Sequence, residues 1–236
     1  MDRRHFIVGA IGVVAVLPLA VRAQGKLKIA TIGAGREGGA LGTRFAKEGY
    51  PVMFSSRNPE GLKDLVAAAG PNAKAGTVAE AVAFGDVVLI VVPYTAVEQI
   101  ARDYGAALAT KQLVIDVSNP IARRDGEEFV KKINDQGGAG LAAAKMFPGA
   151  HLVRAFNAIG SGALEKAAHR AGDPLGVPIA SDDAKAAELA ARLIKDIGFE
   201  AVLVGGMAKG KYLVPGTPLG GEHTPDEIRK IAATLS

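Results

Sequence analysis

The stretch Lys28-Ile-Ala-Thr-Ile-Gly33-Ala-Gly35-Arg-Glu-Gly38 decides the fold of this chain. Residues 28–32 form a short apolar run with β-branched side chains, which predicts a strand. Residues 39–48 place Leu41 and Phe45 on one face, which predicts a helix that ends before Gly49. A Gly-x-Gly-x-x-Gly pattern between a strand and a helix is typical of a turn that holds the pyrophosphate of a dinucleotide.

Each glycine of this turn has a physical role in that hypothesis. Gly33 permits the tight turn, Gly35 lets the backbone approach the pyrophosphate, and Gly38 allows close packing of helix on sheet. The helix start adds unpaired N–H groups and a positive dipole end. The alternative is a glycine-rich turn without a ligand. We predict that a dinucleotide cofactor is bound by the residues of this turn, which are Gly33, Ala34, Gly35, Arg36, Glu37 and Gly38.

Outward from this turn, short apolar runs alternate with amphipathic segments. Further strands are predicted at residues 51–55, 73–75, 86–92, 112–117, 152–156, 178–180 and 200–204. The helices are predicted at 59–69, from 77, at 95–104, 141–147 and 182–197, and after 224. A charged and then Gly-rich segment, 122–140, is expected to hold a short helix within a mobile loop. The alternation predicts an α/β fold with a Rossmann-like, doubly wound parallel sheet.

The second predicted strand indicates which dinucleotide is bound. An Asp or Glu at its end would bind the ribose 2′-hydroxyl of NAD, but no carboxylate occurs there before Glu60. A 2′-phosphate could instead pair with a guanidinium and accept a hydroxyl hydrogen bond. The alternative is a solvated loop with an ordinary arginine. We predict an NADP site that includes Ser56, Arg57, Asn58 and Lys63.

Three later strands also end in residues suited to a cofactor site. Ligands of open α/β sheets bind outside the carboxyl ends of the strands. Pro93 could be only a strand stop, and Asn119 before a proline only a turn former. Their shared position nevertheless predicts contacts with the nicotinamide half of the cofactor. The residues concerned are Val92, Pro93, Tyr94, Asn119, Pro120 and Asn157.

Composition excludes several other functions. The 236 residues include no Cys, which excludes disulfides, zinc-thiolate sites and thiol nucleophiles. None of the four His residues has metal-ligand spacing, so no metal site is expected. The formal net charge is +4, part of it within the first 23 residues, and no basic stripe suggests nucleic-acid binding.

The N-terminal segment is expected to be an export signal. Arg3 and Arg4 precede an apolar run of 16 residues, 6–21, shorter than the 18 or more of a membrane span. Small residues then suit cleavage after Ala23. The paired arginines are similar to a twin-arginine signal; an uncleaved anchor or a plain secretory signal are the alternatives. We therefore expect residues 1–23 to be removed and the mature protein, from near Gln24, to be periplasmic without a membrane span.

Taken in order, these motifs resemble the NADP oxidoreductase, coenzyme F420-dependent family. The resemblance rests on the Gly33–Gly38 turn, Ser56-Arg57-Asn58, Val92-Pro93, Ser118-Asn119-Pro120 and Ala155-Phe156-Asn157. The same domain is similar to the Rossmann domain of pyrroline-5-carboxylate reductases. The resemblance implies that Ser56 and Arg57 hold the 2′-phosphate, and that the later motifs border the nicotinamide. It also implies hydride transfer between NADPH and a flavin or the deazaflavin F420.

Two features leave the activity open. Ser181 stands where that family usually has Gly, and the tail, 207–236, is rich in Gly and Pro before a short helix. Only 32 residues follow Val204, too few for a second helical domain, so the binding domain is expected to span 24–206. No acid or base is evident, and the catalytic residues stay unknown. The alternative to an enzyme with a small-molecule redox acceptor is a non-catalytic NADP sensor or cofactor-stabilised subunit; a homodimer stays open. An enzyme would be favoured if segment 123–140 faced the cleft.

Overall fold

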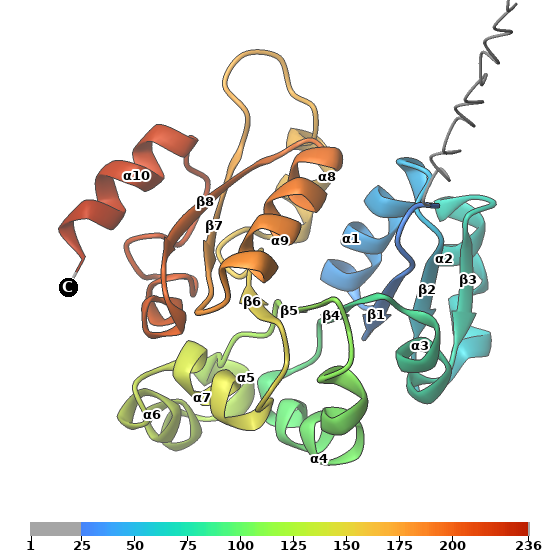
Figure 1. Ribbon diagram of the computed structural model, residues 1–236, viewed down its shortest axis with the longest axis horizontal. Helices are drawn as coiled ribbons and strands as arrows, with labels where there is room; N and C mark the ends of the chain where they lie inside the picture. The colour runs from blue at the N-terminus through green and yellow to red at the C-terminus, as the bar shows by residue number, and fades with distance from the viewer. Residues whose placement is uncertain (1–24, 236) are drawn as a thin grey trace, which may run out of the picture.

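The computed structural model describes residues 25–235, which build one eight-stranded sheet with helices on both faces (Figure 1). In spatial order the strands are β3 (Ala73–Gly76), β2 (Val52–Ser55), β1 (Ile29–Ile32), β4 (Val87–Ile90), β5 (Leu113–Asp116), β6 (Leu152–Arg154), β7 (Gly176–Ala180) and β8 (Glu200–Gly205). The order reverses between β1 and β4, which creates the crevice in which doubly wound sheets bind ligands. The predicted α/β Rossmann-like fold is confirmed, and all eight predicted strands are present.

One strand pair differs from the all-parallel expectation. Strands β3 to β6 are parallel, but β7 is antiparallel to β6, and a single pair, Arg154 and Ala180, joins them. Two residues after the end of β6, Phe156 takes a positive φ of 64°. The chain then passes over the carboxyl end of the sheet, which lets it enter β7 from that side. Strand β8 runs parallel to β7.

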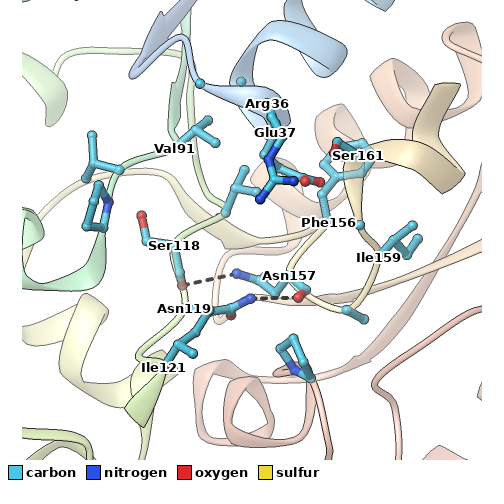
Figure 2. Close-up of a pocket in the computed structure, with 18 of the residues that line it drawn as sticks. Arg36, Glu37, Val91, Ser118, Asn119, Ile121, Phe156, Asn157, Ile159 and Ser161 are labelled. Atoms are coloured by element: carbon cyan, nitrogen blue, oxygen red, sulfur yellow. Dashed lines mark hydrogen bonds between the residues drawn. The ribbon is translucent and has the colours of Figure 1, made fainter. Parts of the chain in front are cut away.

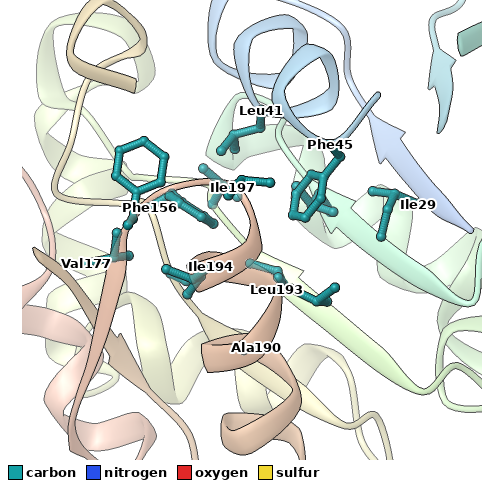
Figure 3. Close-up of a cluster of buried hydrophobic side chains, with 14 of the residues drawn as sticks. Ile29, Leu41, Phe45, Phe156, Val177, Ala190, Leu193, Ile194 and Ile197 are labelled. Carbon is teal, nitrogen blue, oxygen red and sulfur yellow. The ribbon is translucent and has the colours of Figure 1, made fainter. Parts of the chain in front are cut away.

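The helices of one face bury the larger hydrophobic cluster (Figure 3). They are α1 (Arg36–Lys47), α2 (Lys63–Ala69), α8 (Ser161–Ala167) and α9 (Ala184–Asp196). Phe45 of α1, Leu193 of α9 and Ile197, the C-cap of α9, are almost fully buried against the sheet. Asp183 caps α9 by accepting from the N–H groups of residues 185 and 186. This packing fixes α1, and with it the glycine-rich turn.

The opposite face carries α3 (Val78–Phe84), α4 (Val97–Leu108), α6 (Glu127–Asp135) and α7 (Ala139–Met146). Segment 122–140, expected to be a loop with one short helix, contains α5 (Ala122–Asp125), all of α6 and the start of α7. Gly137 and Gly138, with φ near 90°, separate α6 from α7, and Ile133 anchors α6 in the core. The glycines therefore act as a helix boundary and not as a long loop.

The C-terminal tail packs against the last two strands. It contains a 3-10 helix (Met207–Tyr212) and the predicted helix after residue 224, α10 (Pro225–Thr234), which Thr224 and Glu227 start with a capping box. Leu213, Leu219 and Ile228 are fully buried on β7 and β8. Two further 3-10 helices occur at Pro59–Leu62 and Tyr94–Ala96.

The predicted signal at residues 1–23 lies outside the described residues. Within residues 25–235, none of the helices combines the length and apolar character needed to cross a membrane.

Candidate cofactor site

The glycine-rich turn has the geometry that its motif requires. Gly33 has a φ of +97°, and a Cβ there would lie 2.3 Å from the carbonyl oxygen of Val91. A Cβ on Gly38 would lie 2.0 Å from the carbonyl oxygen of Gly33. A Cβ on Gly35 would meet no atom within 4 Å, so the backbone there faces open space. The first and last glycines are needed for packing, and the middle one leaves room for a ligand.

The start of α1 opens toward this space. Gly35 is its N-cap, and in the described part of the chain no side chain caps that end. The first N–H groups of a helix have no intrahelical acceptor, and the helix dipole is positive there. The turn therefore offers a place for an anionic group such as a pyrophosphate.

A cavity of about 540 Å³ continues from this turn across the carboxyl ends of β4, β5 and β6 (Figure 2). Residues 158–162 and Pro215 form a further part of its wall. It is lined by eight of the predicted cofactor residues: Gly35, Arg36, Glu37, Gly38, Val92, Pro93, Asn119 and Asn157. The fold thus brings together motifs that lie more than 100 positions apart in the sequence.

Asn119 and Asn157 are held against each other at the floor of the cavity (Figure 2). The Asn119 side-chain nitrogen donates to the Asn157 carbonyl oxygen over 2.7 Å. The Asn157 side-chain nitrogen donates to the carbonyl oxygens of Asp116, at 3.1 Å, and Ser118, at 3.4 Å. The Oδ1 atom of Asn157 is buried and has no hydrogen-bond partner in the described protein. An orphaned buried acceptor beside a cavity is suited to a ligand that donates a hydrogen bond.

Beneath this pair lies a buried ion pair that the sequence analysis did not identify. Asp116 and Arg154 end two adjacent strands, have no exposed surface and contact each other directly. Arg154 also donates to the Ser118 carbonyl at 3.1 Å and to Asn119 Oδ1 at 3.2 Å. Burial raises the pKa of the Asp116 carboxyl, and the Arg154 guanidinium opposes that shift. The sequence did contain a signal for this ion pair, because Asp116 and Arg154 each end an apolar run that was predicted to be a strand.

Glu37 is an ionisable group inside the cavity wall. Burial raises the pKa of its carboxyl from 4.5 to about 7, while the Ser161 N–H and the Arg36 charge act in the opposite direction. Its Oε1 atom is buried without a hydrogen-bond partner among the described residues.

The predicted phosphate residues lie at the other end of the crevice. Ser55 pairs with Ile32, so the turn that follows β2 begins beside Gly33. The Ser56 hydroxyl accepts from the Asn58 N–H over 3.0 Å, and Arg57 is exposed, with no acidic partner in residues 25–235. Lys63 forms an exposed 3.1 Å ion pair with Glu60. These residues do not line the cavity described above, and their contact with a 2′-phosphate stays a prediction.

Tyr94 does not face the cavity, in contrast to the prediction. It is only 2% exposed, and its hydroxyl donates to the Ala139 carbonyl over 3.0 Å. Burial raises its pKa. The turn after Pro93 directs this aromatic ring into the core toward α7. Gly33, Ala34 and Pro120 also lie outside the cavity lining, where they shape the adjoining turns.

Segment 121–124 forms part of the cavity wall. The sequence alone left undecided whether the charged segment that begins here faces the cleft. Ile121 and Arg124 line the cavity. Arg124 donates to the Asn119 carbonyl at 2.6 Å and forms two 2.8 Å contacts with Asp125. Of segment 123–140, Arg124 lines the cavity, whereas α6 and the start of α7 pack on the opposite face of the sheet. Within residues 25–235 no three His, Asp or Glu side chains gather in a metal-binding group.

The fold and this cavity are those of a Rossmann-type domain with a candidate dinucleotide site. Residues 28–120 match the model of the family described as NADP oxidoreductase, coenzyme F420-dependent. The match confirms the resemblance for the motifs from Gly33 to Pro120 and supports an NADP-dependent enzyme whose acceptor is undetermined. No curated protein sequence matches the chain.

Solved structures show the same fold. A hypothetical protein from Sinorhizobium meliloti is 26% identical, with 86% of this chain and 97% of that chain covered and a TM-score of 0.71. A proposed F420-dependent NADP reductase from Arthrobacter sp. FB24 is 21% identical, with coverages of 78% and 87% and a TM-score of 0.67. The 3-hydroxyisobutyrate dehydrogenase of Mycobacterium tuberculosis is 20% identical, with a TM-score of 0.56. The similar region covers 79% of this chain and 57% of that longer chain.

Proposed function

We propose that the protein is an exported enzyme that transfers hydride between NADPH and a flavin-like or deazaflavin acceptor of the F420 kind. The observation that carries the proposal is the cavity that joins the glycine-rich turn to Asn119 and Asn157. When bound there, NADPH would supply the hydride, and the protein would position the two reactants.

The phosphate end of the proposed site is formed by the turn after β2. Arg57 is exposed and has no acidic partner in the described chain, so its guanidinium is available to a 2′-phosphate. The Ser56 hydroxyl can donate to the same group. Such charge-assisted contacts favour NADP over NAD, because NAD lacks the phosphate.

The nicotinamide end of the proposed site is formed by the two asparagines. The orphaned Oδ1 of Asn157 suits the amino group of the nicotinamide carboxamide, which needs an acceptor when buried. Asn119 is fixed by Arg154 and by the Asn157 carbonyl, so it acts as a rigid support. Both are positioning residues in this proposal.

The acceptor would lie in the part of the cavity next to the nicotinamide, against the remaining wall. Ile121, Ile159 and Pro215 supply apolar surface, and Arg124 supplies a guanidinium. Apolar walls with a few polar groups are typical of sites for planar ring systems. The rival function, a non-catalytic NADP-binding sensor or subunit, does not need this second compartment.

Export forms a separate part of the proposal. It rests on the paired arginines and the apolar run within residues 1–23. A route that carries folded proteins would allow the cofactor to be loaded before export to the periplasm.

Two measurements test the reaction and its cofactor. Stopped-flow oxidation of bound NADPH by flavins, F420 and ferric chelates should be fast for at least one acceptor; tight NADPH binding without oxidation by any of them would favour the rival. Arg57→Ala should weaken NADPH binding about ten- to a hundredfold and leave NADH unchanged, because one charge-assisted contact contributes about 1.5–3 kcal/mol. The exposed Arg102→Ala on α4 is the matched control. Equal losses for both cofactors would rule out the phosphate role.

A further inference from the structure

Glu37 is placed where an ionised carboxylate would be unfavourable for the proposed ligand. It is the second residue of α1, and its side chain points from that helix start toward Ser161 across the upper part of the cavity (Figure 2). The Ser161 N–H acts to lower the pKa of the carboxyl, but Oε1 is buried and has no hydrogen-bond partner in the described structure. One carboxyl oxygen is therefore left for a ligand.

The charges around Glu37 come from three elements. Arg36 precedes it on α1, and Arg124 lies in α5 across the cavity. On α8 the backbone N–H of Ser161 acts on the carboxyl, and Glu165 and Lys166 follow one turn later in the same helix. Glu37 is the single acidic side chain in the described lining. Arg124 is already paired with Asp125, whereas Arg36 has no ion pair within residues 25–235 and its charge acts on the Glu37 carboxyl.

A pyrophosphate at the start of α1 would change the balance of charges at this carboxyl. An anion close to a carboxylate disfavours ionisation, and burial already does so here. A carboxylate could only repel the phosphate, whereas a neutral carboxyl has an O–H that can donate to a phosphate or ribose oxygen. Protonation therefore removes a repulsion and adds a hydrogen bond.

We propose that Glu37 binds the dinucleotide as a neutral acid, taking one proton from solvent as the cofactor enters and donating its O–H to a cofactor oxygen. The inference rests on the proposed function, because it requires a phosphate-bearing ligand at this turn. No bond other than that to the proton is made or broken. Glu37 thereby makes cofactor affinity dependent on pH near neutrality.

The size of the effect follows from linkage. With a pKa of about 7 in the empty site, the neutral form declines tenfold per pH unit above that value. The wild-type dissociation constant for NADPH should rise about fifteenfold between pH 7 and pH 8.5. The 2′-phosphate of the cofactor also titrates, near pH 6. Its titration affects binding to the wild type and to the variants equally, so it cancels when their pH dependences are compared.

The test is calorimetric titration of NADPH into the full chain at both pH values, in buffers of different ionisation enthalpy. Glu37→Gln keeps the shape of a neutral carboxyl and an N–H donor, so it should bind NADPH at pH 8.5 nearly as tightly as at pH 7 and take up about one proton less than wild type at pH 8.5. The exposed Glu98→Gln should behave as wild type.

Two results would overturn the inference while leaving the proposed function standing. One is an equal pH dependence of the wild type and Glu37→Gln. The other is a Glu37→Gln variant that melts like wild type but binds NADPH more than tenfold more weakly at pH 7, which would require the carboxylate. Absence of NADPH binding in wild type at either pH would remove the proposed function and this inference together.

Discussion

Removing the buried positive charge of Arg154, beneath the two asparagines, should be among the single changes that lower the free energy of unfolding most in this protein. Arg154→Met keeps most of the volume but leaves Asp116 buried with no counter-ion, since neither residue has exposed surface. Breaking a buried pair in this way costs about 3–5 kcal/mol. A domain is stable by only about 5–15 kcal/mol, so a large part of its stability would be lost.

The assay is urea unfolding followed by far-UV circular dichroism, together with NADPH titration. The double variant Asp116→Asn, Arg154→Met removes both charges and should regain at least about 2 kcal/mol of the loss. NADPH binding should stay weakened in both variants, because Asn119 has lost the donor that orients its amide. A single variant that costs less than about 1 kcal/mol, or a double variant as unstable as the single one, would refute this account of the ion pair.

Three further outcomes are expected. Gly38→Ala should lower the free energy of unfolding by about 1–3 kcal/mol and shift the melting temperature, because its Cβ would lie 2.0 Å from a backbone carbonyl; an unchanged melting curve would contradict the packing role. In the empty protein, Glu37 stabilises the fold below about pH 4.5, and that contribution is lost as pH rises to about 7, since its pKa is raised on folding. Glu37→Gln should therefore raise the melting temperature relative to wild type at pH 8 and not at pH 4. Replacing Arg3 and Arg4 by Lys should retain the protein in the cytoplasm in a fractionation experiment, whereas unchanged export would indicate a general secretory route.

The sequence by itself determined the features that depend on near neighbours in the chain. The strand–turn–helix at Gly33–Gly38 follows from local steric limits, because no other residue fits the first and last positions of the turn. The capping box at Thr224 involves only residues three positions apart. The order of strands and helices likewise follows from hydrophobic periodicity within each segment.

Only the tertiary structure decided which residues from different strands and helices contact each other. Asp116 and Arg154 are 38 positions apart, and their pairing depends on the register of β5 against β6. The direction of β7 depends on the path of the chain over the end of the sheet after Phe156. The raised pKa of Glu37 depends on α8 closing over α1. Burial and contact between distant segments are properties of the packed molecule, and no pattern within a single segment encodes them.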